Sequence, residues 1–225
     1  MFLFPLAASA VSAVFSALLA RGWAARRRPH LIAWALALAM FALTSLAAAI
    51  GLLAGWNTLL YRSYYLFGAI INVPVLALGT LYLLTSRRIG HVVAAAVAVA
   101  CVVAFVAVFS TAPHATALVT NGIPPGAEAM PSNVRTLSRY YSFSGFFVVL
   151  GGALWSSFKL SRGRGEHLRR LAFANALIAG GTFVVAIASG FARYGRGSIF
   201  AVGLLAGVTL MFAGFLKTRP GARSS

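Results

Sequence analysis

Acidic residues are almost missing from this chain. Its 225 residues include no aspartate and only two glutamates, Glu128 and Glu166, against 19 lysines and arginines. Both glutamates lie in polar connections, so no apolar stretch holds a carboxylate. This argues against a carboxylate proton relay or cation site inside a membrane. Without aspartate, the chain also cannot form a Ser–His–Asp triad.

Cysteine, histidine and lysine are absent from the positions where cofactor chemistry would need them. The one cysteine, Cys101, cannot form a disulfide within the chain and is no metal site by itself. His30, His91 and His167 lie at basic turns, without the spacing of metal ligands. No lysine or histidine lies in the middle of an apolar stretch, which argues against a retinal Schiff base and bis-histidine haem. We therefore expect no metal and no cofactor, and we find no catalytic constellation.

Apolar side chains dominate the composition instead. The chain is 60% hydrophobic and 9% charged, with a mean hydropathy of +0.89. A soluble domain would carry about 25% charged residues, so we predict an integral membrane protein in contact with the lipid bilayer. The net charge of +17 does not indicate nucleic acid, because the basic residues are dispersed between apolar stretches.

Seven apolar spans follow one another, each near the ~20 residues that cross the hydrocarbon core. In lipid, a span of this length must be helical to satisfy its own backbone. We therefore predict an all-α polytopic membrane protein with seven transmembrane helices, approximately Phe2–Ala20, Leu31–Gly55, Leu60–Thr85, His91–Ser110, Arg139–Phe158, Leu171–Arg193 and Ser198–Leu216.

The first span contains Ala8-Ser9-Ala10, which resembles a signal-peptide cleavage site. A signal peptide carries its positive charges before the apolar stretch, whereas here the arginines follow it. We interpret this span as a transmembrane helix. Residues 1–218 are then expected to form one bundle without an extramembrane domain, with 111–138 as a long extracytoplasmic loop and 219–225 as a short cytoplasmic tail.

The basic residues predict the orientation. Fourteen of the 19 fall on one side of the spans, in Arg21–Arg28, Arg87–Arg88, Lys159–Arg170 and Lys217–Arg223. Cytoplasmic loops carry the excess of lysine and arginine. We therefore predict that the N-terminus is outside, that the C-terminus is inside, and that the protein crosses a bacterial cytoplasmic membrane.

One sequence pattern recurs. Apolar spans that open and close on basic residues run over Arg62–Arg88, Arg139–Arg162 and, more faintly, Arg196–Arg219. The chain thus reads as one helix followed by three hairpins. Parallel internal repeats of this kind occur in transporters, although any two amphiphilic spans with basic ends look alike.

A few polar residues interrupt the spans and predict a pocket. Asn72, two residues before Pro74, shares a helix face with Tyr65. The span from Leu171 carries Asn175 and Thr182 on one stripe. We predict an outward-opening pocket that is lined by these residues and by Tyr141, with Arg193 at its mouth; the long loop could cover this mouth. The alternative is that such residues only mediate helix packing, with Asn72 hydrogen-bonded to a neighbouring helix.

Several short segments of the sequence are similar to segments of known proteins: Tyr64–Gly68, Asn72-Val73, Gly79–Leu84 and Arg135–Tyr141. In these the chain resembles uncharacterised seven-helix membrane proteins of high-GC Gram-positive bacteria, a group that implies the fold but transfers no activity. The one-plus-three-hairpin plan, with Trp34 in the second span, is more loosely similar to the seven-helix sensing regions of bacterial histidine kinases.

From the sequence we expect a non-catalytic membrane protein. It would bind a small apolar or amphipathic ligand, or a partner membrane protein, as a sensor or receptor does. Uncharged amides, hydroxyls and aromatic rings suit weakly polar ligands better than ions. A transporter of a small solute or lipid is the alternative. A third possibility is an enzyme acting on lipid at the interface, with His114, Glu128 and the tyrosines as its candidate groups.

Overall fold

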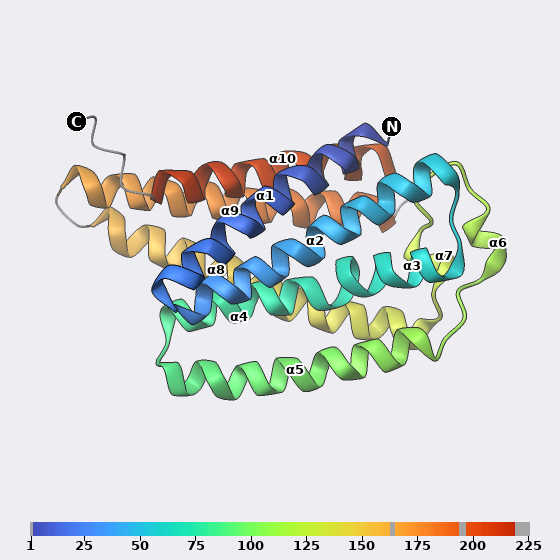
Figure 1. The fold of residues 1–225 in the computed structure, drawn as a ribbon, viewed down its shortest axis with the longest axis horizontal. Coiled ribbons are helices and arrows are strands. Elements are labelled where there is room, and N and C mark those ends of the chain that lie inside the picture. The colour runs from blue at the N-terminus through green and yellow to red at the C-terminus, as the bar shows by residue number, and fades with distance from the viewer. Residues whose placement is uncertain (1, 163–164, 194–196, 219–225) are drawn as a thin grey trace.

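The computed structural model describes residues 2–162, 165–193 and 197–218, and in these ranges all side chains except those of residues 167, 191–193, 197–198 and 218. The described residues contain no strand and include seven helices long and apolar enough to cross a membrane (Figure 1). The predicted all-α fold with seven spans is therefore confirmed, and it is consistent with a multi-pass membrane protein. The predicted tail, 219–225, lies outside the described residues.

Six spans are single helices: α1 (Leu3–Arg26), α2 (Pro29–Ala54), α5 (Arg87–Phe109), α8 (Ser132–Ser161), α9 (Glu166–Arg193) and α10 (Gly197–Thr218). The third span is composite and consists of α3 (Thr58–Tyr64), the π-helix η1 (Tyr65–Ile71) and α4 (Asn72–Leu84). The connection between α5 and α8 holds two short helices, α6 (Ala115–Leu118) and α7 (Gly126–Ala129).

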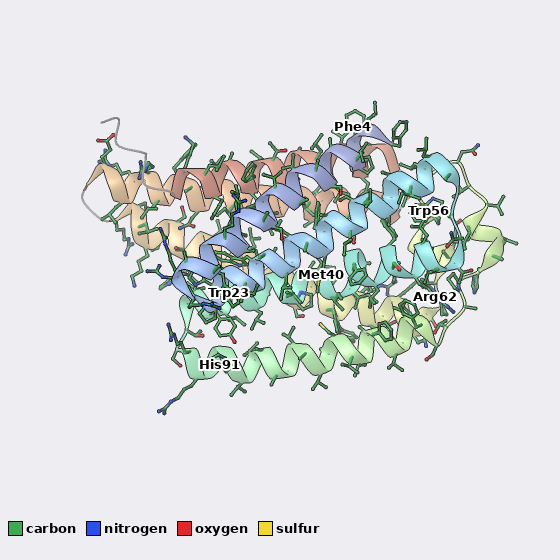
Figure 2. All side chains as sticks on the ribbon, in the orientation of Figure 1. Phe4, Trp23, Met40, Trp56, Arg62 and His91 are labelled. Carbon is green, nitrogen blue, oxygen red and sulfur yellow. The ribbon has the colours of Figure 1, made fainter. Side chains whose placement is uncertain are left out.

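Successive spans run in alternating directions, so the turns gather at two ends of the bundle (Figure 1). The turns after α1, α4 and α8 lie at one end, together with the end of α10. We call this the basic end, because its turns carry most of the lysines and arginines. The α2–α3 turn and the α5–α8 connection lie at the other end, which we call the loop end. Figure 2 shows Trp23 and His91 toward the basic end and Trp56 and Arg62 at the loop end.

Six helices form a ring. In the order α1, α2, α4, α8, α9 and α10, each packs against the next, and α10 packs against α1. α5 lies outside this ring, mainly against α4 and η1 (Figure 1). The closest approach is between α9 and α10, where a Cβ atom placed on Gly207 would lie 2.8 Å from the carbonyl oxygen of Gly181. These glycines allow the two backbones to touch, as in other membrane helix pairs.

Several helices extend beyond their predicted apolar cores. α1 continues through the first arginines and ends only at Arg27, whose φ of 50° is left-handed, just before Pro29 opens α2. α8 begins at Ser132, directly after Pro131, and not near Arg139 as predicted. The apolar core marks the hydrocarbon, but a helix continues into the interface until a backbone signal ends it.

Pro74 accounts for the composite third span. A proline inside a helix has no N–H, and its ring clashes with the carbonyl four residues earlier, here Ile70. The chain accommodates this by widening the preceding turns into the seven residues of η1. The effect of Pro74 on the helix therefore extends back to Tyr65, in the wall of the cavity described next.

Candidate ligand-binding cavity

A cavity of about 570 Å³ lies inside the ring, between α2, the third span, α8, α9 and α10. Pockets for small molecules measure about 300–1,000 Å³, so this cavity can hold one such ligand. Its wall is largely apolar and includes Leu38, Phe41, Val73, Phe200 and Leu204. A smaller number of hydroxyls, one amide and two guanidinium groups complete the described lining.

Asn72 ties two walls of the cavity together. Its side chain is only 7% exposed, and its Nδ2 donates a 2.7 Å hydrogen bond to the carbonyl oxygen of Ala37 on α2. The interhelical bond considered as an alternative is therefore present. The same side chain also lines the cavity, so a structural role does not remove Asn72 from the candidate site.

The wall between η1 and α8 is held by an unusual pair of hydrogen bonds. Ser138 and Ser142, one turn apart on α8, both donate from Oγ to the carbonyl oxygen of Ala69, each at 2.8 Å. Pro74 offers no N–H to the carbonyls four and five residues before it, which are those of Ile70 and Ala69. Serine hydroxyls commonly supply donors to carbonyls that are released in this way.

The predicted pocket residues divide into three groups. Tyr65, Asn72 and Thr182 come together in the lining of the cavity. Tyr141 and Asn175 do not: the hydroxyl of Tyr141 donates to the carbonyl of Ala100 on α5 at 3.1 Å, and the amide of Asn175 donates to Ser156 Oγ at 3.0 Å. The side chain of Arg193 lies outside the described part of the structure.

Tyr141 lies outside the cavity lining because α8 turns a different face inward from the one that was predicted. The sequence predicted that Tyr141 faces the pocket, whereas the face of α8 toward the cavity carries Arg135, Ser138 and Ser142. One residue corresponds to about 100° around a helix. Spacing identifies residues that share a face, but it does not fix which face turns inward.

Two arginines that were not predicted from the sequence as pocket residues also line the cavity. Arg135 and Arg139 are one turn apart near the start of α8. Arg135 Nε is enclosed and has no hydrogen-bond partner among the described residues. Their four-residue spacing was visible in the sequence, but the predicted helix began only at Arg139, so no common face was assigned to them.

Buried aromatic rings surround the loop end of the cavity. Tyr61, Tyr64 and Tyr65 all line it, and Trp56 packs edge-on against Tyr61 and Tyr64 with centroid separations of 5.7 and 5.2 Å. Tyrosine and tryptophan combine an apolar ring with a polar tip, which suits a site that is apolar at one end and wet at the other.

The α5–α8 connection closes over this end. Trp56 Nε1 donates to the carbonyl of Gly122 at 2.8 Å, and Arg62 donates from both Nε and an Nη to the carbonyl of Thr111 at 3.0 and 2.7 Å. Ile123 and Pro124 of the connection line the cavity. The connection is a folded segment, because it includes two short helices and buries apolar side chains.

The site can bind and orient a molecule, but the described lining offers little chemistry. No histidine, cysteine or carboxylate faces the cavity in the described residues, and no cluster of three or more metal-ligating side chains occurs among them. The fold and site together define a class: a seven-helix bundle with an apolar internal cavity. Comparisons with models of protein families, with curated proteins and with solved structures find no match to this chain.

Proposed function

We propose that this chain is a non-catalytic, multi-pass protein of a bacterial cytoplasmic membrane that binds one small amphipathic ligand in its central cavity, in the manner of a receptor or sensor. The observation that carries the proposal is the cavity itself. It has the volume of a ligand site, a mostly apolar wall and a few polar groups on that wall.

The polar groups of the lining favour binding over catalysis. General acid–base chemistry needs a side chain that exchanges protons near neutral pH, usually a histidine or a carboxylate. The described lining instead carries serine, threonine and tyrosine hydroxyls, the amide of Asn72 and two guanidinium groups. The interfacial candidates His114 and Glu128 lie in the connection and do not line the cavity.

A cavity-filling substitution tests the proposal. Ala186 is half-buried and lines the cavity, whereas Ala176, on the same helix α9, is exposed and does not line it. We expect the wild-type protein to retain a small amphipathic molecule in native mass spectrometry from lipid nanodiscs. A186F should lose this molecule, and the matched control A176F should keep it. Circular dichroism and gel filtration would confirm that both variants fold.

Other outcomes would contradict the proposal. Equal ligand occupancy in the wild type, A186F and A176F would mean that the cavity is not the binding site. Recovery of a second protein, with no small molecule from any variant, would favour a partner role. Movement of a solute across vesicles that A186F abolishes would favour the transporter reading.

A further inference from the structure

The cavity carries its positive charge at one end. Arg135 and Arg139 both line it at the loop end, one turn apart on α8. Arg135 is half-buried, and its Nε is enclosed without a hydrogen-bond partner in the described structure. Arg139 is exposed and lies one turn further from the loop end along α8. Two like charges at this spacing repel one another, and an enclosed N–H donor without a partner, such as Arg135 Nε, costs free energy.

No side chain of the described chain neutralises this pair. The two acidic residues are Glu128 and Glu166, and neither forms an ion pair with Arg135 or Arg139. Glu166 begins α9 at the opposite, basic end of the bundle. The positive end of the α8 dipole adds to the same field, because α8 begins only one turn before Arg135.

The opposite end of the cavity is largely apolar; the Thr182 hydroxyl, which donates to the carbonyl of Ile178 in its own helix, is a neutral polar group near it. Beyond Asn72 it is lined by Val73 and Leu76 from α4, Leu38 from α2, and Val208 and Met211 from α10. A ligand that satisfies both ends must carry a negative charge at one terminus and a hydrocarbon chain at the other. Guanidinium groups bind carboxylate and phosphate equally through paired N–H donors.

We infer that the ligand is a single-chain amphiphile with an anionic headgroup, and that Arg135 and Arg139 bind this headgroup beneath the α5–α8 connection while its chain lies along the apolar wall toward Met211. The inference rests on the proposed function and specifies the ligand class for the same cavity. The headgroup is a carboxylate or a phosphate monoester, as in a fatty acid or a lysophosphatidate.

The first test uses the wild-type chain in phosphatidylcholine nanodiscs and a set of radiolabelled probes. Palmitate and palmitoyl lysophosphatidate are the anionic probes, hexadecanol is neutral, and hexadecyltrimethylammonium is cationic. We expect at least one anionic probe to bind tenfold or more tightly than hexadecanol, and the cation to bind most weakly. A preference for palmitate would identify the headgroup of the ligand as a carboxylate, and a preference for lysophosphatidate would identify it as a phosphate monoester.

The second test uses variants. R135Q/R139Q should reduce the affinity for the preferred anion by tenfold or more and leave that for hexadecanol unchanged. R135K/R139K should keep part of the preference, which shows that the fold tolerates substitution here. The matched control is R87Q/R88Q, which removes two charges from exposed positions at the basic end and should keep the preference in full.

These measurements distinguish a failure of the headgroup inference from a failure of the proposed function. If hexadecanol binds wild-type protein as tightly as both anions, the headgroup inference is wrong and the cavity function stands. If R135Q/R139Q weakens all probes equally, the arginines support the fold and do not bind a headgroup. If no probe binds and A186F changes nothing, the proposed function itself fails.

Discussion

The shared carbonyl of Ala69 allows a prediction that separates two physical accounts of the third span. If Pro74 deprives this carbonyl of a backbone donor, Ser138 and Ser142 are its replacement donors, and either one is enough to satisfy it. Each single substitution to alanine then leaves one hydrogen bond in place. The double substitution S138A/S142A leaves a polar group unpaired between packed helices.

The expected magnitudes follow from this difference. A side-chain hydrogen bond between membrane helices contributes about 0.6 kcal/mol on average, so each single variant should lose about that much stability. An unpaired buried acceptor costs about 1–3 kcal/mol, so the double variant should lose about 2–3 kcal/mol. The loss should exceed the sum of the single losses by about 1 kcal/mol.

The assay is reversible unfolding in mixed micelles, followed by circular dichroism, for the wild type, both single variants and the double variant. S144A is the matched control, because the exposed Ser144 hydroxyl donates only within its own helix, to the carbonyl of Tyr141 at 3.2 Å. It should change stability by less than about 0.5 kcal/mol. Additive single losses would refute the reasoning, since they would mean that Ala69 keeps a backbone donor.

Three further predictions concern the bundle. G207L should destabilise the protein by about 2 kcal/mol or more, because its side chain meets the Gly181 carbonyl; G180L, which faces open space, should stay within about 0.5 kcal/mol in the same unfolding assay. R62Q removes two donors from the carbonyl of Thr111. Because hydrogen bonds to charged groups contribute about 1.5–3 kcal/mol, it should speed amide hydrogen exchange in the α5–α8 connection about tenfold. A periplasmically active reporter at the C-terminus should give no signal if the C-terminus is cytoplasmic, and strong activity would reverse the predicted orientation.

The architecture followed from the sequence because hydrocarbon permits few solutions. A span of about 20 apolar residues must form a helix in lipid, and this decided the number and order of the spans without any detail of packing. The same reasoning could not place the start of α8 at Ser132, since hydropathy averages locate the hydrocarbon and not the end of a helix. The π-helix before Pro74 could likewise not be located from the sequence.

The site was less predictable because it depends on helix rotation. Asn72 and Thr182 stood out as polar residues within apolar spans, and they do line the cavity. Tyr141 and Asn175 stood out for the same reason but form hydrogen bonds to other helices. A polar group in a membrane needs a partner, and sequence alone does not say whether this partner is a helix or a ligand.

The distribution of charged and apolar groups along the cavity helps to decide whether the protein binds a ligand or transports it. A transporter of an amphiphile must accept its headgroup on both sides of the membrane, which requires polar or charged groups near both ends of the path. In the described lining the charged groups lie only at the loop end, at Arg135 and Arg139, and the far end is formed mostly by apolar side chains such as Val208 and Met211, with Thr182 as a neutral polar group. If the loop end faces outside, as the distribution of basic residues predicts, an anionic amphiphile would enter with its headgroup at the outer interface and its chain toward the membrane centre, in the orientation that it already has in the outer leaflet. Such a ligand need not turn over to bind, and the described lining offers no charged group beyond Arg139 that would lead it onward, so the gradient of the lining favours retention of a ligand over its passage.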